Sequence, residues 1–330
     1  MMAAASRNTP VTPATRAGAG AAVTSRPTDS PLVAATIVEN TAPASGTPDV
    51  WPSVRDRASS PEAIPRRCRG AAPITALLFG ELNIPTPMPS GAMRTMKPSG
   101  PMPAVMAGHS LGEYSALVCA GALPFAQAVQ LVRQRGEYMQ QAVPLGTGAM
   151  AAVLGLERAA VEAACAAACT ADEIVAVANY NAPLQSVVAG HTAAVARAGS
   201  AAQAAGAKRV VTLPVSAPFH CSLMRPAADA LAPALAAAHI TPPAIPVINN
   251  VDVAAASEPE AIRDALIRQI YSPVRWVEVI EAMAARGVTR VVECGPGKVL
   301  AGLTKRICSE LDSLFVQDPA SLRQALAALA

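Results

Sequence analysis

The sequence lacks the features that would place it in a membrane or outside the cell. Its 330 residues hold no uninterrupted apolar run of about 18 residues, the length that a membrane-spanning helix needs, and no secretory hydrophobic segment. The seven cysteines are scattered and odd in number, which predicts free thiols in a reducing compartment. Cys165 and Cys169 lie four residues apart without a histidine or acidic partner, so packing explains them better than metal binding. We therefore expect a cytoplasmic protein with no bound metal.

Charge is also sparse, at 15% of residues, and the net charge is +3. Residues 1–103 hold ten basic and six acidic residues, so the remaining 16 basic and 17 acidic residues give the rest of the chain a net charge of −1. This near-neutral part of the chain, residues 104–330, has no basic surface of the kind that binds nucleic acid. A chain of this length, with 52% hydrophobic residues, can bury one large core with an insertion, or two domains.

Residues 1–103 differ in composition from the rest of the chain. They contain 16 of the 30 prolines and show no sustained helical or strand period. This composition is typical of a disordered segment or a linker. We predict that residues 1–103 are disordered, or that they are not a native part of the protein formed by the rest of the chain. Residues 74–79 are the one candidate strand within it.

The stretch 104–114 has the pattern of a nucleophile elbow, in which a strand and a helix are joined by a sharp turn that carries a serine. An apolar run leads into Gly-His-Ser-Leu-Gly, and apolar positions follow at helical spacing. The glycines at 108 and 112 allow strand and helix to approach closely. The N–H of Leu111, at the first helical turn, would point at an oxyanion beside Ser110.

Ser110 needs a base, because a hydroxyl group is a poor nucleophile at neutral pH. Of the four histidines, His109 adjoins the serine but points away, His191 begins a helix, and His239 lies in a polar connection. His220 follows a strand, where α/β enzymes place catalytic groups. An isolated histidine is more often structural than catalytic, so spacing alone leaves both roles open for His220.

Several blocks of sequence together resemble the malonyl-CoA:acyl-carrier-protein transacylases of fatty acid synthesis, in the order and at the spacing of that family. The resemblance covers the chain from about Pro103 to its end. The blocks are 108–118, 133–136, 181–185, 218–221, 247–252 and 295–298.

The resemblance implies a Ser110–His220 dyad without a catalytic acid, in which a main-chain carbonyl at Arg275 orients the histidine. It also implies that Arg135 binds the free carboxylate of the malonyl group, because a guanidinium can donate two parallel hydrogen bonds. The residues alone would favour a solvated arginine on a helix, like Arg133.

Other positions take roles from the same resemblance. Phe219 would line a pocket that admits malonyl rather than a branched acyl group. Asn181 and Gln185 would face the cleft, although turn formation explains them equally well. Four basic residues have two possible roles: they contact the carrier protein, or they are exposed charges that keep the protein soluble. They are Lys208, Arg209, Lys305 and Arg306.

The expected fold is α/β. Residues 104–145 and 217–330 would form a hydrolase-like domain with a parallel sheet and the nucleophile elbow. Residues 146–216 read strand–helix–strand–strand–helix–strand, which predicts an inserted ferredoxin-like α+β domain.

The expected function is ping-pong transfer of malonyl from malonyl-CoA to the phosphopantetheine thiol of acyl carrier protein, by a monomer that needs no cofactor and does not bind nucleic acid or membranes. Two alternatives remain. The family's Gly-Gln-Gly-Ser-Gln type loop, which supplies the second oxyanion donor, is missing, so the chain could be an impaired or inactive remnant. A serine esterase is the other alternative, although Asp172 and Glu173 are poorly placed to complete its triad.

Overall fold

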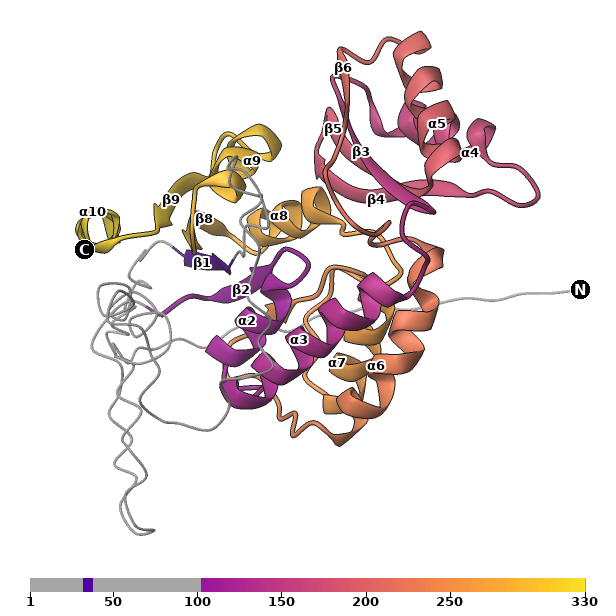
Figure 1. The fold of residues 1–330 in the computed structure, drawn as a ribbon. Helices are drawn as coiled ribbons and strands as arrows, with labels where there is room; N and C mark the ends of the chain where they lie inside the picture. Colours follow the sequence, from indigo (N-terminus) through magenta and orange to yellow (C-terminus); the bar gives the residue numbers. More distant parts are fainter. Residues whose placement is uncertain (1–31, 38–101, 330) are drawn as a thin grey trace, which may run out of the picture. The chain divides into compact units, whose positions relative to one another are not determined.

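The larger of two sheets carries the nucleophile elbow. The computed structural model describes residues 32–37 and 102–329 (Figure 1). The sheet has five strands in the order β7-β2-β1-β8-β9, and every pairing in it is parallel. Its strands are β1 (Leu32–Ile37), β2 (Val105–Gly108), β7 (Val247–Ile248), β8 (Val288–Cys294) and β9 (Asp312–Val316).

Strand β1 was not predicted from the sequence. It lies between β2 and β8, and Ile37 pairs with Gly108 on one side and Cys294 on the other. The carboxyl end of β1 therefore meets the same edge of the sheet as the residues that follow Gly108. The candidate strand 74–79 lies outside the described residues.

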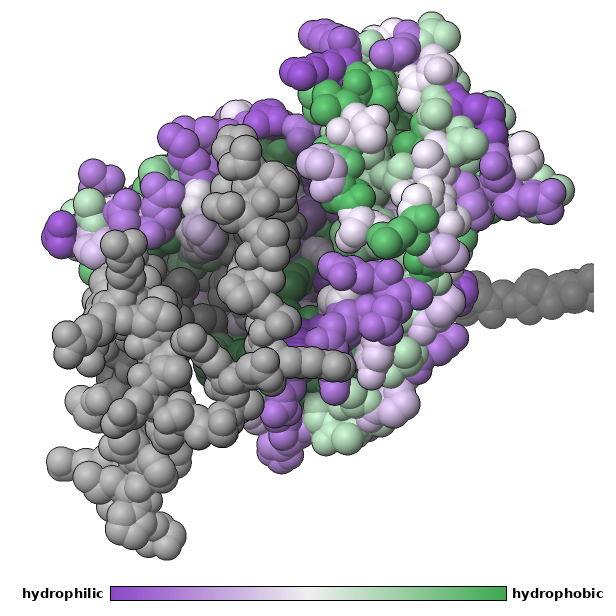
Figure 2. All heavy atoms as spheres, viewed as in Figure 1, coloured by the Kyte–Doolittle hydropathy of each residue, from purple (hydrophilic) through white to green (hydrophobic). Residues whose placement is uncertain are grey.

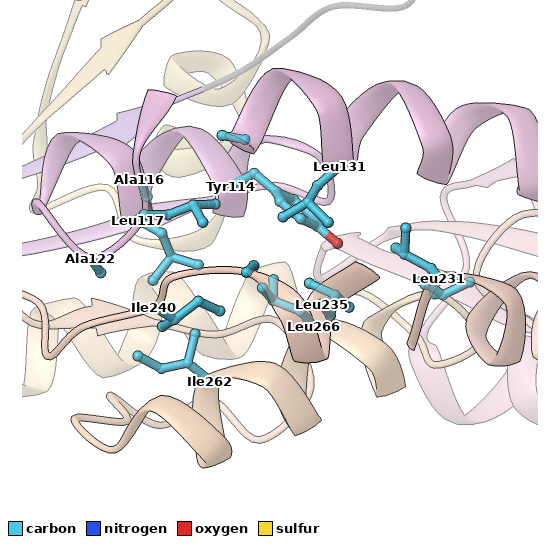
Figure 3. Packing of buried hydrophobic residues seen from close by; sticks show 14 of the residues in the cluster. Tyr114, Ala116, Leu117, Ala122, Leu131, Leu231, Leu235, Ile240, Ile262 and Leu266 are labelled. Carbon is cyan, nitrogen blue, oxygen red and sulfur yellow. The ribbon is translucent and has the colours of Figure 1, made fainter. Parts of the chain in front are cut away.

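A helical core packs beside β2. It is formed by α2 (Gly112–Cys119), α3 (Phe125–Gln141), α6 (Arg225–Ala237) and α7 (Pro259–Gln269). Tyr114, Leu131, Leu231 and Leu266 are among its buried side chains, drawn from all four helices (Figure 3). Hydrophilic residues follow α3 on the face shown in Figure 2.

The close approach of α2 to β2 depends on a glycine. A Cβ atom on Gly108 would lie 1.9 Å from the carbonyl carbon and oxygen of Gly112. Only a glycine fits there without moving the helix, which bears out the structural role expected for it.

The second sheet is antiparallel, with strand order β4-β5-β3-β6. Its elements are β3 (Gly148–Leu154), α4 (Arg158–Ala168), β4 (Val175–Ala182), β5 (Gln185–His191), α5 (Thr192–Ala204) and β6 (Arg209–Thr212). Val274 connects this sheet to the rest: its N–H donates to Ala178 O (2.9 Å), and its carbonyl accepts from Tyr180 N (2.9 Å).

The remaining helices are α8 (Trp276–Ala285), α9 (Val299–Ile307), α10 (Pro319–Leu329) and the short η3 (Ser222–Met224). Along residues 32–37 and 102–329, no helix is both long and apolar enough to cross a membrane. Six cysteines lie in these ranges, and all six are free thiols.

Candidate active site

Ser110 occupies a strained position between β2 and α2. Its φ is 52°, in the left-handed region that non-glycine residues rarely adopt. The Asn250 side chain holds this conformation, because its Oδ1 accepts from Ser110 N (2.7 Å) while its Nδ2 donates to Gly108 O (2.8 Å). Asn250 thus clamps the backbone on both sides of the turn.

His220 reaches the serine from 110 positions further along the chain. The Ser110 hydroxyl donates to His220 Nε2 across 2.7 Å, the geometry of a nucleophile with its base. His220 is buried and also has a positive φ, of 60°. The structure thus pairs the two residues that the sequence proposed as a dyad.

The carbonyl that orients His220 belongs to Gln269, at the end of α7. His220 Nδ1 donates to Gln269 O (2.9 Å), which leaves Nε2 free of a proton and able to accept one. The sequence-based assignment of this role to Arg275 is wrong. The Arg275 carbonyl instead accepts from Val279 N (3.0 Å) in the first turn of α8.

Burial favours the neutral form of His220. Desolvation, and secondly the positive charge of Arg135, lower the pKa of His220 from 6.5 to about 3, against the opposing effect of its hydrogen bond to Gln269 O. The imidazole is therefore an unprotonated base across the neutral range.

Arg135 lies on the buried face of α3 and points at the nucleophile. Its Nη2 donates to Ser110 Oγ (3.0 Å) and to Gln269 Oε1 (3.1 Å). Only 6% of Arg135 is exposed, whereas Arg133, two residues earlier, is exposed and pairs with Glu137. The Nε–H of Arg135 is buried and has no acceptor among the described residues. Arg135 is therefore not the solvated helix residue that its local sequence favoured.

Gln269 and Glu113 are site residues that the sequence analysis missed. The Gln269 side chain is fully buried, and its Nε2 donates to Ser110 O (3.0 Å) and Glu113 Oε2 (2.8 Å). Glu113 Oε2 also accepts from Asn250 N (2.9 Å). Burial raises the pKa of the Glu113 carboxyl to about 7, against the effects of its hydrogen bonds and of Arg135. Glu113 lies within the block 108–118 and Gln269 in none of the blocks, but the sequence signals the role of neither, because their contacts join positions more than a hundred residues apart.

Asn181 is near the elbow, but Gln185 contacts a different element. Asn181 Oδ1 lies 2.9 Å from Nε2 of His109, whose ring packs edge-on against Trp276. Gln185 Oε1 instead accepts from Arg306 Nη1 of α9 (2.6 Å).

Phe219 and Leu111, the other candidate residues, adjoin the dyad in the sequence. Phe219 is half-buried directly before His220 and packs against both the helical core and the β3–β5 side of the second sheet. Leu111 has helical dihedral angles at the start of α2, and its N–H has no acceptor among the described residues. Within the described ranges, no three His, Cys, Asp or Glu side chains gather in a way that could hold a metal ion.

At the edge of the parallel sheet, Ser110 on the elbow turn meets His220, which a main-chain carbonyl holds, and Arg135 from α3. This arrangement defines a class: α/β enzymes that form an acyl ester on serine. Comparison with known families gives the same class, since the model of the acyl transferase domain matches residues 86–318. The chain belongs to this family and is an acyltransferase. The match begins upstream of Pro103, where the sequence resemblance had been expected to start.

Among curated relatives, the malonyl CoA-acyl carrier protein transacylase of Escherichia coli (strain K12) is 56% identical over 227 residues, covering 69% of this chain and 73% of that protein. The protein of that name from Bacillus subtilis (strain 168) is 46% identical over 237 residues, covering 72% and 75%. These matches confirm the resemblance stated from the sequence.

Solved structures agree with the curated relatives. An acyl carrier protein S-malonyltransferase from Vibrio cholerae is 58% identical, with a TM-score of 0.67, and covers 68% of this chain and 73% of its own. A malonyl-transacylase in complex with its type II PKS acyl-carrier protein is 52% identical, with a TM-score of 0.68 and coverage of 70% and 74%.

Proposed function

We propose that this chain takes a malonyl group from malonyl-CoA onto Ser110 as an ester and passes it to the phosphopantetheine thiol of an acyl carrier protein, in fatty acid biosynthesis. The observation that carries the proposal is the position of Arg135, whose Nη2 lies 3.0 Å from the Ser110 Oγ that would bear the acyl group. The names of the relatives support it, since they refer to malonyl-CoA and acyl carrier protein.

Arg135 has one free donor that fits a carboxylate: its Nε–H lacks an acceptor among the described residues, while both Nη2 hydrogens donate, one to Ser110 Oγ and one to Gln269 Oε1. In a guanidinium, Nε–H and one Nη2–H lie parallel on the same edge and can donate to both oxygens of a carboxylate. A carboxylate on this edge would pair with Nε–H and take over the Nη2 hydrogen that now meets Ser110 Oγ. A simple acyl ester would leave this buried cation unpaired, which disfavours a serine esterase.

The reaction runs in two half-reactions with the same proton path. Ser110 Oγ attacks the thioester carbonyl while His220 Nε2 accepts the hydroxyl proton, and the proton then goes to the coenzyme A sulfur as the carbon–sulfur bond breaks. In the second half, the carrier thiol gives its proton to His220 and attacks the ester, and Ser110 recovers the proton. The N–H of Leu111 would stabilise the oxyanion in both halves.

The second oxyanion donor is where this chain departs from its family. Strand β1 ends at Ile37, opposite Gly108, and the sequence continues Val38-Glu39-Asn40-Thr41 rather than with the family's Gly-Gln-Gly-Ser-Gln type loop. Loss of one donor costs about 10²–10³ in rate in other enzymes. We therefore expect transfer slower than in relatives that carry the loop.

We also propose the expected division into domains. The strand order of the first sheet supports a hydrolase-like domain formed by 104–145 and 217–330 together with β1 (Leu32–Ile37), which the expected bounds left out. The element order and the strand order β4-β5-β3-β6 support a ferredoxin-like insertion at 146–216.

The test compares Arg135→Ala with Arg133→Ala, two substitutions on the same helix. With labelled malonyl-CoA and carrier protein, the parent chain should label the carrier, and Ser110→Ala should not. Arg135→Ala should weaken malonyl transfer by roughly 2–5 kcal/mol while sparing slow acetyl transfer, because it removes the charge that meets the carboxylate. Arg133→Ala, which breaks only an exposed ion pair, should change neither.

Two results would count against the proposal. Unchanged malonyl-over-acetyl preference in Arg135→Ala would remove Arg135 from the substrate site. A folded parent chain that never labels the carrier would instead identify an inactive remnant.

A further inference from the structure

The side-chain amide of Gln269 takes no part in the proton path, yet it contacts three elements of the site. Its oxygen accepts from Arg135 Nη2 (3.1 Å), and its nitrogen donates to Ser110 O (3.0 Å) and Glu113 Oε2 (2.8 Å). The side chain is fully buried. One amide thus links the cation, the backbone of the nucleophile and a buried carboxyl group.

We propose that the Gln269 amide, oriented by Glu113, is a positioning unit that sets the preference for carboxylate-bearing acyl groups by holding the Arg135 guanidinium beside Ser110. This inference rests on the proposed function and adds residues that determine specificity. Neither side chain needs to touch the substrate.

The orientation of the amide decides whether Arg135 has an acceptor. An amide can rotate by half a turn, which exchanges its oxygen and its nitrogen. Arg135 offers only donors and Ser110 O only accepts, so a single orientation satisfies both. Glu113 selects that orientation, because its Oε2 accepts from the Gln269 nitrogen and is itself fixed by Asn250 N (2.9 Å).

The bond from Arg135 to Gln269 can persist throughout the reaction cycle. The other acceptor of Arg135, the Ser110 hydroxyl, becomes an ester oxygen once the serine is acylated. Gln269 Oε1 is chemically unchanged in both half-reactions. A carboxylate can accept two parallel hydrogen bonds from Arg135 only if the guanidinium plane is held in a fixed orientation. Loss of the hydrogen bond to Gln269 should therefore slow malonyl transfer more than acetyl transfer.

The test measures kcat/KM with malonyl-CoA and with acetyl-CoA for Gln269→Met, which keeps the main-chain carbonyl that orients His220 but removes the amide. Malonyl transfer should fall about 10- to 100-fold and acetyl transfer by less than about threefold, as expected for the loss of one hydrogen bond to a charged group. Glu113→Leu should behave like Gln269→Met. Glu113→Gln should stay within about threefold of the parent for both substrates, because its amide oxygen can still accept.

A double-mutant cycle adds a second readout. If Gln269 acts through Arg135, Gln269→Met in an Arg135→Ala background should leave the malonyl-to-acetyl ratio unchanged. Labelling of Ser110 by an uncharged fluorophosphonate reports folding and the dyad independently of acyl specificity. If Gln269→Met fails to fold, Gln269→Asn is the second variant. It keeps an amide but shortens the side chain by one methylene, and so tests the same contact with Arg135.

Equal losses for malonyl and acetyl, or additive effects in the cycle, would overturn this inference and leave the proposed function intact. So would damage from Glu113→Gln equal to that from Glu113→Leu. A parent chain without any malonyl preference would overturn both.

Discussion

Two residues of the site, Ser110 and His220, adopt φ angles of 52° and 60° that are unfavourable for any residue with a side chain. The turn at Ser110 is held by the Asn250 amide, which bonds to Ser110 N and Gly108 O. His220 is held through its ring by the carbonyl of Gln269. At the residue scale, local strain is balanced by hydrogen bonds from distant parts of the chain.

The lowered pKa of His220 predicts an unusual pH profile. Because the pKa is about 3 rather than 6.5, acylation of Ser110 should show no fall near pH 6.5 and should stay level from about pH 7 to pH 5. Rapid-quench measurement of the labelled chain at each pH tests this. A fall centred on pH 6.5 in acylation, with the chain still folded, would show that His220 is not held neutral.

The same shift has a consequence for stability. Between about pH 6.5 and pH 3 the unfolded chain binds a proton at His220 that the folded chain does not bind. Stability should therefore be lost as the pH falls through this window, and His220→Asn should lose less of it. Denaturant unfolding of both chains at pH 7 and at about pH 5 measures the difference.

Whether a site residue could be predicted from the sequence depended on the role that the residue plays. Ser110, His220 and Arg135 were identifiable because nucleophile, base and anchor require particular residue types in recognisable blocks. Gln269 was missed because it acts partly through its main chain, which any residue has. The same reason explains the error at Arg275: the geometry of a helix end decides which carbonyl faces His220.

At the element scale, the contact between β2 and α2 has no room for a side chain. Gly108→Ala would place a methyl group 1.9 Å from backbone atoms of Gly112, so we expect a loss of more than about 3 kcal/mol of unfolding free energy. Gly136→Ala is the matched control in α3, where nothing lies within 4 Å, and it should stabilise the chain by about 0.5–1 kcal/mol.

Denaturant midpoints of the two variants measure this prediction. Wild-type stability for Gly108→Ala would mean that α2 can move away from β2 without loss.

Regular elements with a clear period were predicted closely, and irregular ones were not. The order strand–helix–strand–strand–helix–strand expected for 146–216 is the order in which β3, α4, β4, β5, α5 and β6 follow one another. Strand β1 was missed because a six-residue, largely apolar run without alternation cannot be distinguished from a helical segment by its period, and this run lies in a proline-rich segment. Its place is set by pairing with β2 and β8, which only the assembled sheet shows.

At the scale of the whole molecule, the sheet depends on a strand that lies outside the region matched by the family model. Deleting residues 1–37 would leave β2 and β8 without the strand that joins them, and the chain should not fold cooperatively. Deleting residues 1–30 leaves every described strand, so the unfolding of that shortened chain should match the unfolding of the parent.

Thermal unfolding of the two truncated chains tests this. Cooperative unfolding and Ser110 labelling in the chain that lacks residues 1–37 would show that β1 is dispensable.

The most direct measurement is mass spectrometry of the Ser110 peptide after brief exposure of the purified chain to malonyl-CoA, followed by a chase with carrier protein that bears phosphopantetheine. We expect a malonyl ester on Ser110 that disappears as malonyl appears on the carrier thiol, and no ester in His220→Ala. A folded, fluorophosphonate-reactive chain that forms no malonyl ester, or an ester that the carrier never removes, would contradict it.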